Sequence, residues 1–235
     1  MLLHMLTPFY PFSFILPHPA SMEKTVFPLR QKNLRLSFCS FIITAKEECA
    51  MSLLVIWCSP NQEGLTAKCK SALVRGVLEY GMECSEVHLN RLNIGRCQVC
   101  STGFGQCAQK GTCVLEDDFN RLYSLMQQCD ALSLVTPVYW HDMAEPLKAL
   151  LDRVRRCDCK VNHALNGKKA MIVACAGGSG NGAIRCLGLM EDTLKHMGMD
   201  VRERLPVTRF SSDYMPKAIQ SAAWHLCYEL NEKQQ

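Results

Sequence analysis

The sequence predicts an α/β fold in which a five-stranded parallel sheet is covered by helices on both faces. From Met51 onward, short apolar runs alternate with segments whose apolar residues recur at helical spacing. Five strands that alternate with five helices indicate parallel pairing, because the helices serve as the crossover connections. This stretch shows no internal repeat and no second domain, so we expect one domain over residues 51–235.

The first half of this domain supplies two strands and two helices. Leu53–Trp57 is a buried apolar run, and Cys84–Leu89 is a second, less apolar one. The helix between them should end at Gly81, since glycine favours helix C-caps. Glu116–Asp118 should open the second helix, because acidic residues stabilise the positive end of the helix dipole. The apolar positions that define these two helices are Leu65, Cys69, Leu73 and Val77, then Phe119, Leu122, Tyr123 and Met126.

The second half continues the alternation with three strands and three helices. The strands are expected at Ala131–Val135, Ala170–Ala174 and Val201–Val207. The apolar face of the first of these helices consists of Leu147, Leu150, Leu151 and Val154. That of the second consists of Leu187, Met190, Leu194 and Met197, and Gly198 closes this helix. The third helix is expected at Pro216–Leu230.

Residues 1–50 differ from the rest of the chain. Prolines interrupt every apolar run, and no helical or strand period persists. A secretory signal would instead begin with a basic region followed by an unbroken apolar core. We therefore expect residues 1–50 to be a disordered extension or a gene-start artefact, with Met51 as the biological start; a targeting segment is the alternative.

Composition narrows the classes of function. The net charge of +4 comes without a long basic block, which argues against nucleic-acid binding. No uninterrupted apolar stretch approaches the roughly 20 residues of a membrane-spanning helix. The 15 cysteines are an odd number, which disfavours a fully paired disulfide framework and favours reduced thiols in the cytoplasm.

Three loops should carry a ligand, because doubly wound sheets bind ligands outside the carboxyl ends of their strands. The first loop, Ser59–Thr66, joins a buried strand to the N-terminus of a helix. Backbone N–H groups, the helix dipole and hydroxyl donors together suit a phosphate there. The alternative is that Ser59 and Thr66 only cap the helix.

The second loop, Thr136–Met143, contains two adjacent aromatic residues, Tyr139 and Trp140. Aromatic side chains at a strand end suit a planar aromatic ligand. Packing under the next helix or at a subunit contact is the alternative. His141 follows them and is either a solvated loop residue or an acid–base group.

The third loop, Cys175–Gly182, is rich in glycine. Its glycines permit a close approach of the backbone to a ligand, while a flexible connector is the alternative.

A separate loop holds four cysteines at the spacing Cys97-x2-Cys100-x6-Cys107-x5-Cys113. Four thiolates in one short loop can fold around a metal centre, and such sites select zinc or an iron-sulfur cluster. The ligand type leaves a 4Fe-4S cluster, zinc and no metal as open alternatives. Cys157 and Cys159 are fallback ligands or packing thiols.

Three motifs together resemble the NADPH-dependent FMN reductase-like branch of the flavodoxin superfamily, and within it the iron-sulfur flavoproteins. The resemblance covers residues 51–215. Its most specific stretch is Thr136-Pro-Val-Tyr-Trp-His-Asp-Met-Ala-Glu-Pro-Leu-Lys-Ala-Leu-Leu-Asp-Arg153. The loop Ser59-Pro60 through Gly64-Leu65-Thr66 and the pair Asp117-Asp118 before an aromatic residue also match.

The resemblance implies a flavodoxin-like sheet with strand order 2-1-3-4-5, bound FMN and an oligomeric assembly. This chain has Asn61, Leu65 and His141 where the family usually has Arg, Asn and often Gly. The first two departures remove phosphate-binding side chains, so FMN affinity should rest more on backbone amides. The implied FMN ligands are Ser59, Asn61 and Thr66 at the phosphate, and Pro137, Val138, Tyr139, Trp140, Gly177, Gly178, Ser179 and Gly180 at the ring.

In iron-sulfur flavoproteins a compact cysteine motif in this position binds a 4Fe-4S cluster, although its second and third cysteines are closer than Cys100 and Cys107. The resemblance implies an FMN-dependent oxidoreductase that passes electrons between NAD(P)H or ferredoxin, FMN and the cluster. No protein acid or base is required, and His141 would only shape access to the ring. The alternatives are a cluster-free NAD(P)H-dependent flavin or quinone reductase, and a zinc-binding interaction or sensor module without flavin.

Overall fold

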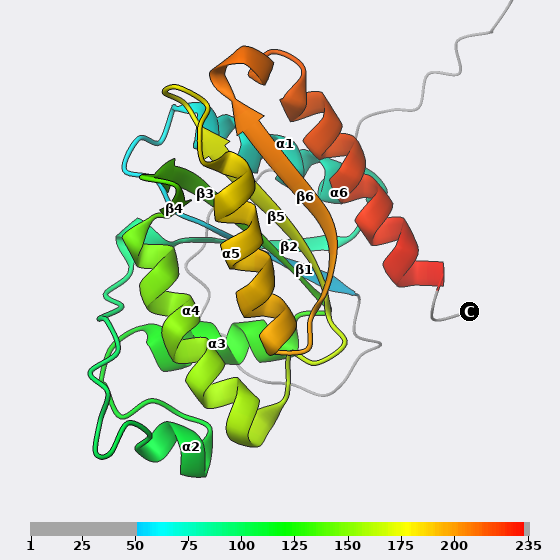
Figure 1. Ribbon diagram of the computed structural model, residues 1–235. Helices are drawn as coiled ribbons and strands as arrows, with labels where there is room; N and C mark the ends of the chain where they lie inside the picture. Colours follow the sequence, from blue (N-terminus) through cyan, green and yellow to red (C-terminus); the bar gives the residue numbers. More distant parts are fainter. Residues whose placement is uncertain (1–50, 233–235) are drawn as a thin grey trace, which may run out of the picture. The chain divides into compact units, whose positions relative to one another are not determined.

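A parallel sheet forms the centre of residues 51–232, the part of the chain that this computed structural model describes (Figure 1). The strand order is β2-β1-β3-β5-β6, with all neighbours on this path parallel. Counted as parallel strands along the chain, this is the order 2-1-3-4-5, so the predicted flavodoxin-like fold is confirmed. The strands are β1 (Ser52–Trp57), β2 (Glu83–His88), β3 (Ala131–Tyr139), β5 (Lys169–Ala176) and β6 (Asp200–Thr208). The expectation for residues 1–50 lies outside the described residues.

Helices cover both faces of this sheet (Figure 1). One face carries α1 (Leu65–Tyr80) and α6 (Met215–Glu232), and the other carries α3 (Phe119–Gln128), α4 (Glu145–Cys157) and α5 (Ala183–His196). Shorter elements are α2 (Gln106–Lys110) inside the cysteine loop, a π-helical turn at Asp158–Asn162, and 3-10 turns at Leu89–Arg91 and Arg209–Ser211. None of the helices described is long and apolar enough to cross a membrane.

Two hydrophobic cores result from the alternation of side chains along the strands. In β1, Leu54 and Ile56 face the layer of α3, α4 and α5, whereas Leu53, Val55 and Trp57 face α1 and α6. All five side chains are buried. A strand buried on both faces reads as a continuous apolar run, which is the pattern that predicted it.

Close packing of α1 against α6 depends on Gly76. A Cβ atom at this position would lie 2.1 Å from the backbone carbonyl oxygen of Gln220. No side chain fits there without moving one of the two helices. The two helices therefore pack backbone against backbone at this point.

The predicted extent of the third strand was wrong. β3 continues through Thr136 and Pro137, which pair with β5, to Tyr139, and Val138 and Tyr139 then pair antiparallel with β4 (Asp142–Met143). The segment expected to be a loop after Val135 is thus mostly a hairpin. Proline inside an apolar run indicates the end of a strand, but here it occupies a ladder position near the end of the paired segment.

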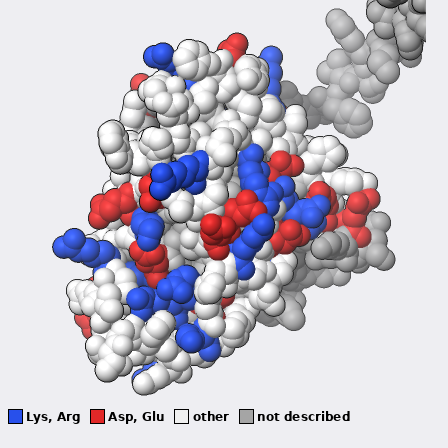
Figure 2. Space-filling view, viewed as in Figure 1, with Lys and Arg blue, Asp and Glu red and all other residues white. Residues whose placement is uncertain are grey.

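Charged side chains of both signs alternate over α5 and β6 (Figure 2). Arg204 of β6 donates through Nη2 to the Glu191 carboxylate of α5 at 2.6 Å, and Lys195 also pairs with Glu191. This face is therefore close to electrically balanced.

Candidate functional site

The three candidate ligand loops meet at one edge of the sheet. They follow β1, β3 and β5, which are consecutive in the strand order. The carboxyl ends of parallel strands lie at the same edge, so the loops after these strands are neighbours.

The loop after β1 presents an uncapped helix N-terminus. Ser59 donates through Oγ to the carbonyl oxygen of Asn61 at 3.0 Å, and the Asn61 Oδ1 atom accepts the N–H of Glu63 at 3.0 Å. Gly64 precedes α1, and no side chain caps the helix. Ser59 and Thr66 are buried but are not caps, so the capping alternative was wrong. First-turn N–H groups without a cap are suited to an anion.

Arg91 lies beside this loop and was not predicted. Its Nη2 atom donates to the Oε1 atom of Gln62 at 2.8 Å. Arg91 ends the 3-10 turn after β2, the strand next to β1. Because β2 pairs with β1, the segments that follow the two strands are neighbours, and this could have identified Arg91 from the sequence. The loop therefore has a guanidinium close by, although Asn61 stands where the family usually has Arg.

The loop after β3 is a two-residue hairpin with an uncommon backbone. Trp140 and His141 have φ angles of 52° and 72°, and the pairs Val138–Met143 and Tyr139–Asp142 close the hairpin. Positive φ at both central residues is the geometry of a type I′ turn, which prefers Asn and Gly. Trp140 is 96% exposed, so it does not pack under the following helix. The hairpin instead holds a large aromatic side chain out at the edge of the sheet.

A hollow of about 310 Å³ lies between this hairpin and the glycine loop. Gly182 brings the two together, because a Cβ atom there would lie 2.7 Å from the Cα atom of His141. Of the predicted ring ligands, Pro137, Tyr139 and Gly177 do not line the hollow; Pro137 is part of the β3–β5 ladder. The lining residues are Val138, Trp140, His141, Ala176, Gly178, Ser179, Gly180 and Asn181, of which Ala176 and Asn181 were not predicted.

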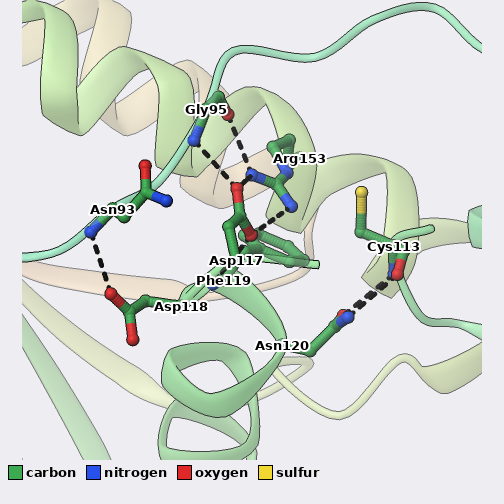
Figure 3. Close-up of polar contacts among 8 residues, drawn as sticks. All are labelled: Asn93, Gly95, Cys113, Asp117, Asp118, Phe119, Asn120 and Arg153. Atoms are coloured by element: carbon green, nitrogen blue, oxygen red, sulfur yellow. Dashed lines mark hydrogen bonds and ion pairs between the residues drawn. The ribbon is translucent and has the colours of Figure 1, made fainter. Parts of the chain in front are cut away.

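The cysteine loop is closed at its base by hydrogen bonds between its two ends (Figure 3). The Asn93 N–H donates to the Asp118 Oδ2 atom at 2.8 Å, and the Asp118 N–H donates to the Asn93 carbonyl oxygen at 3.0 Å. Further into the loop, the Gly95 N–H donates to the Asp117 Oδ2 atom at 2.9 Å. Asp117 also accepts the N–H of Phe119, the first residue of α3. The acidic residues that precede α3 therefore tie the loop to the helix.

Arg153 of α4 completes this closure (Figure 3). Its Nη1 and Nη2 atoms donate to the two Asp117 carboxylate oxygens at 2.6 and 2.9 Å, and Nη1 also donates to the Gly95 carbonyl oxygen at 2.8 Å. The guanidinium lies over the Phe119 ring, 4.1 Å from its centroid. Although burial opposes ionisation, the bonds from Arg153 and from the backbone hold the pKa of Asp117 below its usual value. The sequence indicated Arg153 only as the last residue of the motif Thr136–Arg153 and did not predict its contact with the cysteine loop.

All four predicted cysteines line one pocket, together with a fifth, Cys157. Asn120 fixes the backbone of Cys113, accepting its N–H at 2.9 Å and donating to its carbonyl oxygen at 2.8 Å (Figure 3). Cys159, the other fallback ligand, does not line the pocket; its thiol contacts the carbonyl oxygen of His196. The four loop cysteines that share the pocket are Cys97, Cys100, Cys107 and Cys113.

The pocket combines thiols with positive charge. Arg153 and Arg156 of α4 line it beside Cys157. Burial, followed by the nearby thiols Cys113, Cys107 and Cys97, raises the pKa of Cys157 to about 12. Among residues 51–232, no three His, Cys, Asp or Glu side chains are already arranged to ligate a metal ion. The donor set fits an anionic thiolate-bound centre, and ligation would require the thiols to move closer together.

Comparison with known proteins shows which family this chain matches. The family model for NADPH-dependent FMN reductase matches residues 51–208. An iron-sulfur flavoprotein from Archaeoglobus fulgidus is 33% identical over 96 residues, which is 41% of this chain and 42% of that protein. An iron-sulfur flavoprotein from Methanosarcina thermophila is 27% identical over 143 residues, 61% of this chain and 72% of that protein. The match thus spans less than half of the Archaeoglobus relative.

Solved structures agree on the fold. NAD(P)H:quinone oxidoreductase from Methanothermobacter marburgensis superposes with a TM-score of 0.61 at 18% identity, covering 76% of this chain and 98% of that one. A flavodoxin from the domain Archaea superposes with a TM-score of 0.54 at 12% identity, covering 77% of this chain and 99% of that one.

Proposed function

The chain belongs to the NADPH-dependent FMN reductase family, an oxidoreductase family of the flavodoxin superfamily, and we propose that it passes electrons between FMN and an iron-sulfur cluster held by its cysteine loop. The observation that carries the proposal is the pocket that collects Cys97, Cys100, Cys107 and Cys113, within a chain of an FMN reductase family. A flavin reductase without a cluster has no need for such a pocket.

FMN would supply hydride and single-electron transfer when bound, and the protein would position it. Ser59, Asn61, Thr66 and the uncapped first turn of α1 would hold the phosphate, with Arg91 near enough to add positive charge. The hairpin Val138–His141 and the glycine loop at Gly178–Gly180 would hold the ring, since both border the same hollow. Trp140, being almost fully exposed, would control access to one side of it.

The cluster would be ligated by the four loop cysteines and supply one-electron transfer. Arg153 and Arg156 border the same pocket, and their charge would offset that of the thiolates. We further propose NAD(P)H or a one-electron protein such as ferredoxin as the redox partner, a homo-oligomeric assembly, and a reducing compartment such as the cytoplasm for a chain with so many thiols.

An anaerobic preparation reconstituted with FMN, iron and sulfide tests this proposal. We expect a flavin absorbance spectrum, with iron and acid-labile sulfide bound in stoichiometric amounts. Cys107→Ser should lose most of the iron and keep FMN, because the cysteine pocket shares no lining residue with the hollow between the hairpin and the glycine loop. Cys159→Ser is the matched control and should keep both, because this thiol does not line the pocket.

The other outcomes identify the competing functions. Flavin without iron or sulfide would indicate a cluster-free NAD(P)H-dependent flavin or quinone reductase. The long gap between Cys100 and Cys107 would then account for the absence of a cluster. A colourless protein with stoichiometric zinc would indicate a zinc-binding interaction or sensor module. Absence of flavin after reconstitution would refute the FMN-dependent activity.

A further inference from the structure

Arg153 closes the cysteine loop, but its side chain also has one buried hydrogen-bond donor that this closure does not use. The side chain is only 1% exposed, and its bonds to Asp117 and Gly95 use Nη1 and Nη2. Its Nε atom is buried and has no hydrogen-bond partner among residues 51–232. A buried donor without an acceptor has lost its bond to water with no replacement, so an N–H group left in this state indicates a missing partner.

The Arg153 side chain borders the cysteine pocket. Arg153 lines that pocket together with the loop cysteines and Cys157. The two hydrogen bonds to the Asp117 carboxylate hold the guanidinium in place beside this pocket. The side chain is therefore a fixed cation, since arginine is not deprotonated in proteins.

We infer that Arg153 is a positioning residue for the cluster, with Nη1 and Nη2 clamping Asp117 while the Nε–H donates to a sulfur atom of the bound centre. This inference rests on the proposed cluster. Hydrogen bonds to sulfur and nearby positive charge both favour the more negative, reduced state of an iron-sulfur cluster, so Arg153 raises the reduction potential. Asp117 fixes the guanidinium in place from the opposite side.

Two substitutions separate this role from a purely structural one. Arg153→Gln and Asp117→Asn break the same ion pair, and each leaves one buried partner uncompensated. Both should therefore loosen the loop to a similar degree. Only Arg153→Gln removes the donor and the positive charge at the sulfur atoms, whereas Asp117→Asn leaves the guanidinium and removes its counter-charge.

The experiment is a redox titration of the reconstituted full-length protein, followed by EPR of the reduced cluster. Arg153→Gln should lower the reduction potential by at least 59 mV, a tenfold change in the equilibrium constant for a one-electron couple. Asp117→Asn should raise the potential or leave it unchanged. Arg155→Gln is the control, because this neighbour on α4 does not line the pocket, and its potential should match the wild type.

A second measurement leaves the Arg153–Asp117 ion pair intact. Wild-type protein labelled with ¹⁵N at arginine Nε should show a ¹⁵N coupling in pulsed EPR of the reduced cluster, and the coupling should persist in Arg156→Gln.

Three results would overturn the inference. Equal potentials in Arg153→Gln and the wild type, or a missing ¹⁵N coupling, would overturn it and leave the proposed function standing. Wild-type protein that binds FMN but no iron or sulfide would overturn it together with the proposed cluster.

Discussion

His141 occupies a backbone position that its side chain disfavours. Its φ angle of 72° follows the 52° of Trp140, and both are central residues of a two-residue hairpin. Residues other than Gly are uncommon in this region, although His is enriched there together with Asn and Asp, and strain at such positions is often retained at functional sites. The family's preference for Gly at this position therefore has a conformational reason.

Replacing this residue should stabilise the protein. We expect His141→Gly to raise the free energy of unfolding by about 1 kcal/mol, because Gly adopts positive φ without steric cost. Urea unfolding of both proteins measures the difference. Asp142→Gly is the control and should destabilise, since Asp142 is not at positive φ and its Oδ1 atom accepts the Met143 N–H at 2.7 Å. A less stable His141→Gly variant would show that the hairpin is not strained.

Asp117 should make stability depend on pH in the acid range. Its pKa is lower in the folded protein than the ordinary value of 3.8, so the unfolded chain binds the proton more readily. The stabilisation is fully present above that ordinary value and is lost as the pH falls through the lowered folded value. At pH 6, Asp117→Asn should cost about 3 kcal/mol because Arg153 is left as an unpaired buried charge.

Urea unfolding from pH 2 to pH 6 measures this effect. The stability difference between wild type and Asp117→Asn should shrink as the pH falls below the ordinary carboxyl value. Asp152→Asn is the control, because its ion pair with Lys148 is exposed and should change stability little at any pH. A difference that stays constant with pH would mean that the Asp117–Arg153 pair does not account for it.

Among the helices, the contact between α1 and α6 tolerates the least change. Gly76 allows the two backbones to approach, with Gln220 as its neighbour. The helix pair therefore has no room for a side chain at residue 76.

Two glycine substitutions test this contact. Gly76→Ala should destabilise the protein by about 2 kcal/mol, because the added methyl group overlaps a backbone oxygen. Gly188→Ala in α5 is the matched control, since nothing lies within 4 Å of the added Cβ atom. It should stabilise the helix by about 1 kcal/mol, the difference in helix propensity. Thermal unfolding of both variants measures these changes in stability. Equal changes in the two variants would mean that α1 and α6 can move apart freely.

The domain as a whole places its two candidate centres on different elements. The flavin loops follow β1, β3 and β5, whereas the cysteine pocket is built from the loop 97–115 and the end of α4. Helix α4 connects them, since it begins directly after the hairpin and ends at Cys157. We expect the loss of metal ligands to leave the flavin loops intact.

A chain that starts at Met51 should reproduce the full-length protein. The family match begins at residue 51, and the strands, helices and candidate sites described above lie between residues 51 and 232. We expect residues 51–235 to match the full chain in unfolding midpoint and FMN affinity, measured by urea unfolding and fluorescence titration. A lower midpoint or weaker FMN binding would assign residues 1–50 a role in the fold and contradict our interpretation of them.

The sequence by itself determined the α/β class, the positions of the ligand loops and the four loop cysteines. These features are local, because periodicity and strand-end motifs are read from neighbouring residues. Only the tertiary structure decided that Arg153 closes the cysteine loop through Asp117, 36 residues away, and that Cys157 joins the pocket. It also decided the hairpin at Trp140 and His141, because strand pairing and a buried ion pair depend on contacts that no local pattern encodes.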